Sequence, residues 1–226
     1  MKTSRVSYIL FDLDGTLIDS VPDLAYCIDV AMRAAGLPVK GESAVRDWVG
    51  NGIEKLVARA VTNSVQGSAD HALYNVALAA FIEAYTHYNG KHSTLYEGVL
   101  PTLDWLIGHD YRLACVTNKA AAFTLPLLHN KGLAQYFDVV VSGDTCAHKK
   151  PHPAPLNYAL NALEAKPDNA LMVGDSKSDI HAARAAGCLV YALSYGYNHG
   201  EDISSYRPDR VLDSLSELPH ILNNNE

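Results

Sequence analysis

Two aspartates separated by one residue, Asp12 and Asp14, are the first candidates for chemistry in this sequence. They follow an apolar run rich in β-formers at 8–11 and precede Gly15 and Thr16. Because residues i and i+2 of an extended strand point to the same side, both carboxylates can face one site. Close carboxylates repel each other, which favours a bound cation or a proton held on one of them. Such a pair could bind a divalent ion beside phosphate while one acid attacks and the other moves a proton. Alone, it fits a strand ending in an acidic turn equally well.

Two further polar segments follow or precede predicted elements. A strand predicted at Leu113–Thr117 brings the Thr117 hydroxyl and the Asn118 amide to the start of the next helix, a natural oxyanion site. Lys150 precedes a helix predicted at Leu156–Leu163, and its ammonium could offset phosphate charge. Taken singly, these residues are more typical of a helix cap and a solvated loop.

Two more acids, Asp175 and Asp179, follow a strand predicted at Leu171–Val173. Gly174 allows a tight turn between them and the strand. Because the acids are four residues apart, we expect them to share a face of the following helix. Their oxygens would suit a hard cation.

The elements that must position these residues alternate along most of the chain. Strands are predicted at 8–11, Leu113–Thr117, Val139–Ser142, Leu171–Val173 and Leu189–Leu193, and helices near Leu100–Ile107, through Leu127 to Gly132, at Leu156–Leu163 and at Ile180–Ala186. This alternation indicates an α/β fold with a doubly wound parallel sheet. Ligands of such Rossmann-like sheets bind beyond the carboxyl ends of the strands, where all the candidate residues fall.

Residues 20–92 instead predict consecutive helices without a strand. Ser20 is a candidate N-cap, with Asp23 three residues later. Apolar residues at helical spacing predict further helices over Ile53–Val61 and Leu73–Tyr88. The segment therefore reads as a helical insertion after the first strand.

Composition excludes several classes of protein. The net charge is −7 and no run is rich in Lys or Arg, so we expect neither a nucleic acid nor an anionic membrane as partner. No apolar stretch approaches the roughly 18 residues of a membrane span. Met1–Arg5 leads into a strand without a signal-peptide pattern, which predicts a cytoplasmic location. The cysteines form no metal or redox motif and are expected to be packing thiols in a reducing cytosol: Cys27, Cys115, Cys146 and Cys188.

In combination, the motifs resemble the haloacid dehalogenase superfamily of phosphohydrolases. The matching residues are Asp12-Leu13-Asp14-Gly15-Thr16, Thr117-Asn118, Lys150 and Gly174-Asp175-Ser176-x-x-Asp179. The resemblance implies a core domain of residues 1–19 and 93–226 and a helical cap domain of residues 20–92. Within the superfamily, residues 11–24, 48–52, 149–156 and 195–197 resemble the bacterial phosphoglycolate phosphatase family.

That resemblance implies a role for each residue. Asp12 would attack phosphorus and form an aspartyl-phosphate, and Asp14 would protonate the leaving alkoxide and then activate water. Thr117, the backbone around Asn118, and Lys150 would hold the phosphoryl oxygens.

It also implies a cofactor, Mg²⁺, bound by Asp12, the backbone carbonyl of Asp14, and Asp175. Asp179 would support Lys150 or a metal-bound water. The expected reaction is hydrolysis of 2-phosphoglycolate, a small phosphorylated organic acid, by a monomer or weak homodimer. Alternatives are a phosphatase for a sugar phosphate or nucleotide, a sugar phosphomutase, and a non-enzymatic binder, which would not need Asp14.

Substrate choice is expected to lie in the cap. Arg46 and the segment containing Gly50, Asn51 and Gly52 are predicted at an interhelical turn. Glycines there permit positive φ and expose backbone N–H groups. A loop of this kind could close over the site and meet the substrate carboxylate, although a simple helix–helix turn has the same pattern.

Overall fold

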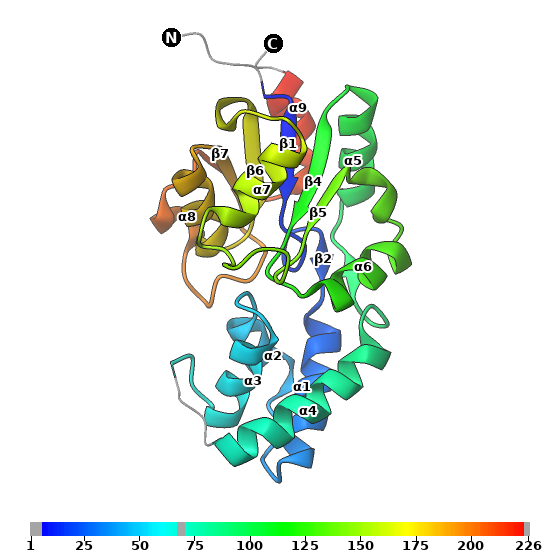
Figure 1. Ribbon diagram of the computed structural model, residues 1–226, viewed down its shortest axis with the longest axis vertical. Coiled ribbons are helices and arrows are strands. Elements are labelled where there is room, and N and C mark those ends of the chain that lie inside the picture. Colours follow the sequence, from blue (N-terminus) through cyan, green and yellow to red (C-terminus); the bar gives the residue numbers. More distant parts are fainter. Residues whose placement is uncertain (1–5, 67–70, 224–226) are drawn as a thin grey trace.

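The computed structural model describes residues 6–66 and 71–223, which form two parts stacked along the long axis (Figure 1). A sheet flanked by helices forms one part and four helices form the other. Met1–Arg5, on which the expectation about a signal peptide rests, lies outside the described residues.

The sheet is parallel throughout, with the strand order β5-β4-β1-β6-β7-β8. Its strands are β1 (Tyr8–Phe11), β4 (Arg112–Val116), β5 (Val139–Val141), β6 (Ala170–Gly174), β7 (Leu189–Leu193) and β8 (Arg210–Leu212). Central β1 pairs with both β4 and β6, which sets Phe11 opposite Cys115 and Val173. The predicted doubly wound α/β fold is thus confirmed. The edge strand β8 was not predicted, because its three residues carry too little apolar pattern.

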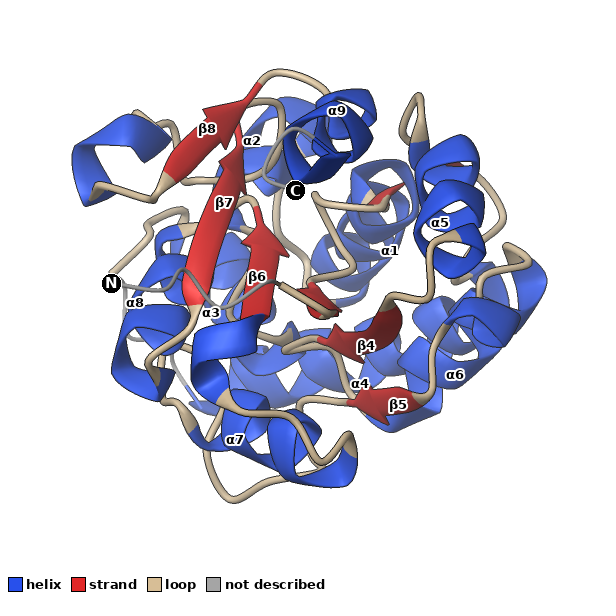
Figure 2. Ribbon diagram, turned by 90° about the horizontal axis from the view of Figure 1, so that it is seen from above, coloured by secondary structure: helices blue, strands red, loops and turns tan. Residues whose placement is uncertain are grey.

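Helices cover both faces of this sheet (Figure 2). On one face lie α5 (Val99–Gly108), α6 (Ala121–Asn130) and α9 (Leu218–Asn223), and on the other α7 (Ala154–Ala162) and α8 (Lys177–Ala186). Single 3₁₀ turns occur at Ala134–Tyr136, Pro167–Asn169, Ile203–Tyr206 and Leu215–Glu217. Along β1, Ile9 and Phe11 face the first layer and Leu10 the second, and all three are buried. This two-sided burial explains why the strands read as continuous apolar runs.

The second part consists of α1 (Val21–Ala34), α2 (Gly41–Trp48), α3 (Ile53–Thr62) and α4 (His71–Tyr88). It has its own apolar core, in which Ile28, Met32 and Phe81 are fully buried. Helix α2 was not predicted, because only Val45 and Trp48 of its residues are buried. This arrangement supports our proposed division into a core of 1–19 and 93–226 and a cap of 20–92.

A short antiparallel pair, β2 (Ile18–Asp19) and β3 (Thr94–Leu95), lies where the chain leaves the sheet and returns to it. Beside it, the buried Asp23 carboxylate accepts hydrogen bonds from the backbone N–H groups of Gly90, His92 and Ser93, at 2.8–3.0 Å. Ser20 occupies the N-cap position of α1, as predicted, but its buried hydroxyl makes no capping hydrogen bond.

Two other expectations concern the chain as a whole. All four cysteines are unpaired thiols, and Cys27, Cys115 and Cys188 are buried. Among the described residues, every helix is too short or too polar to cross a bilayer.

Candidate active site

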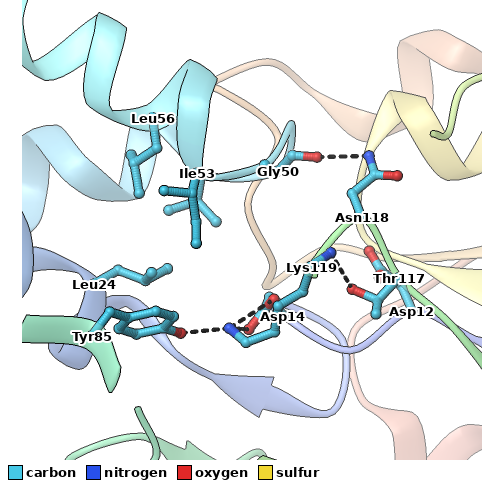
Figure 3. A pocket seen from close by; sticks show the side chains of 12 residues that line it. Asp12, Asp14, Leu24, Gly50, Ile53, Leu56, Tyr85, Thr117, Asn118 and Lys119 are labelled. Atoms are coloured by element: carbon cyan, nitrogen blue, oxygen red, sulfur yellow. Dashed lines mark hydrogen bonds and ion pairs between the residues drawn. The ribbon is translucent and has the colours of Figure 1, made fainter. Parts of the chain in front are cut away.

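The turn after β1 carries Asp12 and Asp14 into a pocket between core and cap (Figure 3). The Asp12 N–H donates to the Val173 carbonyl at 2.9 Å, which extends the pairing with β6 by one residue. Gly15 then turns the chain at φ 89°. A Cβ at Gly15 would lie 2.3 Å from Asp175 Oδ2, so only glycine lets the turn approach that carboxylate.

Asp12 forms a largely buried ion pair with Lys150, whose side chain is 1% exposed. Asp12 Oδ1 lies 2.9 Å from Lys150 Nζ and accepts from the Leu13 N–H at 2.8 Å. Burial raises the pKa of Asp12 to about 7, although Lys150 opposes this increase. Lys150 Nζ also donates to Asp179 Oδ1 and to the Val116 carbonyl, both at 2.6 Å. Burial lowers the pKa of Lys150, but the two carboxylates more than offset that effect and hold the pKa above its ordinary value.

Asp175 and Asp179 both lie close to Asp12, but they occupy different positions relative to α8. Asp179 lies in the first turn of α8, whereas Asp175 precedes the helix, so the prediction that they share a helix face is wrong. Carboxylate oxygens of Asp12, Asp175 and Asp179 nevertheless lie within 4.8 Å of one another. Both oxygens of Asp179 are occupied, one by Lys150 and the other by the N–H and hydroxyl of Ser176. Asp179 therefore serves to hold Lys150.

The geometry of these acids fits a hard divalent cation. Burial raises the pKa of Asp175 well above its ordinary range, and the charges of Asp12 and Asp179 add to this effect. A cation would relieve the same repulsion, and carboxylate oxygens are its preferred donors. Gly196, like Gly15, approaches Asp175 too closely for any side chain, since an added Cβ would lie 2.1 Å from the Asp175 Cβ.

The segment after β4 brings Thr117 and Asn118 to the same edge of the sheet. Thr117 lines the pocket, and its hydroxyl accepts from the Lys119 N–H at 3.2 Å. The Asn118 side chain joins neighbouring loops: it donates to the carbonyls of Gly50 and Lys150 and accepts from the Lys150 N–H, at 2.9–3.1 Å. Its amide thus fixes the loops around the pocket and one point of the cap.

A residue that sequence reasoning missed, Lys119, lies beside Asp14. Its side chain is 5% exposed, and Nζ lies 3.1 Å from Asp14 Oδ1 and donates to the Tyr85 hydroxyl of α4 (Figure 3). Burial lowers the pKa of Lys119, but Asp14 and Tyr85 more than offset it, so the pKa stays above its ordinary value. Its position directly after Thr117-Asn118, at the same strand end, was the available signal. Tyr85 was read only as an apolar position of a helix.

The loop between α2 and α3 covers the pocket from the cap side. Gly50 and Gly52 line the pocket and have the predicted positive φ, 120° and 91°. Asn51 instead accepts from the Arg59 guanidinium at 2.8 Å, and Arg59 also donates to the Trp48 carbonyl. Asn51 and Arg59 therefore hold the loop in shape.

Arg46 does not lie on that turn, as was predicted, but in the last turn of α2. Its guanidinium lies 3.2 Å from Asp19 and 2.9 Å from Glu42, and stacks over the Tyr197 ring at 5.3 Å. These contacts direct Arg46 to the junction of cap and core and away from the residues that line the pocket.

Comparison with known proteins agrees with this geometry. The family model of haloacid dehalogenase-like hydrolases matches residues 9–193. A phosphoglycolate phosphatase of Nitrosococcus oceani is 51% identical over 95% of both chains, and one of Vibrio parahaemolyticus is 44% identical over 98% of both. A crystal structure from Haemophilus somnus, described as a predicted phosphoglycolate phosphatase, superposes with a TM-score of 0.91 at 36% identity and covers 96% of this chain and 98% of its own. The chain therefore belongs to the family of haloacid dehalogenase-like hydrolases, as its motifs predicted.

Proposed function

We propose that this chain is a phosphatase that hydrolyses 2-phosphoglycolate to glycolate and phosphate. The observation that carries the proposal is the pairing of Asp12 with Lys150 and of Asp14 with Lys119 around one pocket. The cavity, of about 50 Å³, favours a compact substrate over a nucleotide. The names of the relatives that span nearly the whole chain support the choice of phosphoglycolate.

In the first half of the proposed reaction, Asp12 attacks phosphorus with the oxygen that Lys150 does not hold. The bond between phosphorus and the glycolate oxygen breaks as the aspartyl-phosphate forms, and Asp14 transfers a proton to the departing alkoxide. Thr117, the backbone at Asn118, and the Lys150 ammonium stabilise the charge on the phosphoryl oxygens.

In the second half, Asp14 accepts a proton from the water that attacks the phosphorus of the aspartyl-phosphate. Phosphate leaves and the Asp12 carboxylate is restored. We assign Asp12, Asp175 and the backbone carbonyl of Asp14 as the groups that would hold Mg²⁺, which supplies Lewis-acid stabilisation of the phosphoryl charge. Asp179 keeps Lys150 in place throughout.

Gly50 and Gly52 are proposed to shape the loop that covers the substrate. A cytoplasmic location remains our proposal, supported by the unpaired cysteines, and so does a monomer or weak homodimer. A net charge of −7 supports small anions admitted by local cations, rather than nucleic acid or membrane, as partners.

The proposal is tested by measuring phosphate release with Mg²⁺ from 2-phosphoglycolate, hexose phosphates and nucleoside monophosphates. We expect the highest kcat/KM for 2-phosphoglycolate, no turnover by Asp12→Asn, and loss of activity on chelation. A higher kcat/KM for a hexose phosphate, or transfer of the phosphoryl group to a second sugar without phosphate release, would replace the proposed function with one of its alternatives.

A further inference from the structure

The ammonium groups of Lys119 and Lys150 are both buried beside the reacting acids, and they differ in the number of N–H donors that remain for a ligand. A lysine ammonium has three N–H donors. Those of Lys150 are used by Asp12, Asp179 and the Val116 carbonyl. Lys119 is bonded to two groups, Asp14 and Tyr85, so one donor remains for a ligand.

Lys119 is also the one cation among the described residues that line the pocket. The cap side of the pocket has four apolar side chains, Leu24, Val49, Ile53 and Leu56, beside Gly50, Gly52 and Tyr85. None of these residues has a charged side chain that could pair with a charged group on the part of the substrate beyond its phosphate. Arg46, the cation first expected to do so, is bound to Asp19 and Glu42 outside the pocket lining.

The chemistry of the substrate places its carboxylate near Lys119. In 2-phosphoglycolate a single methylene separates the carboxylate from the ester oxygen, which must face Asp14 to receive its proton. The substrate carboxylate therefore lies beside Asp14, and burying its charge in the pocket requires a partner of opposite charge. Lys119, already held at Asp14, is placed to bind both Asp14 and the substrate carboxylate.

We infer that Lys119 is the residue that selects a carboxylate-bearing substrate, by giving its remaining N–H donor to that carboxylate. Tyr85 holds the ammonium at the boundary of core and cap, and the apolar side chains of the cap side strengthen a charge-assisted bond by excluding water. This inference rests on the proposed function and adds to it the group that recognises the acid.

The alternative is that Lys119 only positions Asp14 or joins core to cap. Either role would affect all substrates alike, whereas carboxylate selection affects acids alone. The test therefore compares 2-phosphoglycolate with 2-hydroxyethyl phosphate, which has the same chain length and no charge beyond its phosphate. Wild-type, Lys119→Met, Lys119→Arg and Tyr85→Phe enzymes are compared by kcat and KM on both substrates.

We expect Lys119→Met to reduce the wild-type preference for 2-phosphoglycolate by about 10- to 150-fold, the range expected for one hydrogen bond to a charged group. The reduction should appear mainly in KM for the acid. Lys119→Arg, which keeps the charge, should recover most of the preference, and Tyr85→Phe, which keeps the ammonium, should retain it. Should the Met variant not fold, Lys119→Gln provides the same comparison, since its amide can still donate to Asp14.

Equal losses on both substrates in the Met or Gln variant would overturn the inference and leave the proposed function intact. A wild-type enzyme that hydrolyses 2-phosphoglycolate no better than 2-hydroxyethyl phosphate would overturn both. The two failures are distinguished by the wild-type measurement alone.

Discussion

Replacing the proposed nucleophile should make the metal-free protein more stable in alkaline solution. Burial raises the pKa of Asp12 from its ordinary 3.8 to about 7, so the folded protein binds this proton more tightly than the unfolded chain does. The resulting stabilisation is fully present below about pH 4 and is lost as the pH rises through about 7. Asp12→Asn keeps nearly the same shape and has no charge to desolvate.

The size of the effect follows from the increase in pKa. An increase of about three pKa units corresponds to about 4 kcal/mol of destabilisation once Asp12 is ionised. Asparagine also loses hydration on burial, so this figure is an upper limit. For a protein of this size it corresponds to a gain in Tm of at most about 8–16 °C for the variant at about pH 8.5, falling toward zero near pH 4.

Thermal unfolding measured by circular dichroism with a chelator, at several pH values between about 4 and 8.5, tests this expectation. Asp47→Asn is the matched control, because it removes the charge of an exposed aspartate. Added Mg²⁺ should stabilise the wild type most at high pH and the Asp12 variant much less. If the wild type and Asp12→Asn showed the same dependence of Tm on pH, Asp12 would not be the buried acid described above.

Two further predictions concern catalysis and the cap loop. Asp14→Asn should slow hydrolysis of 2-phosphoglycolate by about 10²–10⁴-fold and that of an activated aryl phosphate far less, because a phenolate needs little protonation. Steady-state rates on both substrates test this prediction. Equal losses on both would restrict Asp14 to the water-activating step. Gly52→Val should destabilise the protein by about 1–2 kcal/mol and also raise KM, since its φ is 91° and an added Cβ would lie 2.8 Å from Lys149 Nζ. Gly36→Val, at φ 70° in open space, should show a similar loss of stability in denaturant unfolding and an unchanged KM; an unchanged KM in both variants would remove Gly52 from substrate binding.

The sequence pattern predicted those structural features that are determined within a single short segment of the chain. Asp12 and Asp14 fall at a strand end because β1 is a continuous apolar run, and Gly187 ends α8 with the φ of 79° that glycine favours there. The alternation of elements after residue 93 likewise predicted the sheet. These features depend on neighbours within a few residues.

Features that depend on distant partners were not predicted. The Lys119 ammonium is held by a hydrogen bond to Tyr85, which lies 34 residues earlier and in another part of the fold. Asp23 looked like part of a helix cap, yet its carboxylate binds backbone groups about 70 residues away. Arg46 was assigned to a turn because the eight-residue helix that carries it has only two buried residues to mark it.

The β2–β3 pair has a consequence for how the cap was added to the core. Residues Ile18 and Leu95 face each other in antiparallel pairing, which holds their Cα atoms about 5 Å apart. The helical insertion therefore connects β2 to β3 as the turn of a hairpin would, with its first and last residues close together. Asp23 links these two ends through its hydrogen bonds to Gly90 and Ser93. A helical segment of another sequence and length could therefore replace the insertion without a change in strand register, provided that its ends meet at the same spacing. Substrate range can then diverge in the exchanged segment while the acids at the strand ends remain in place.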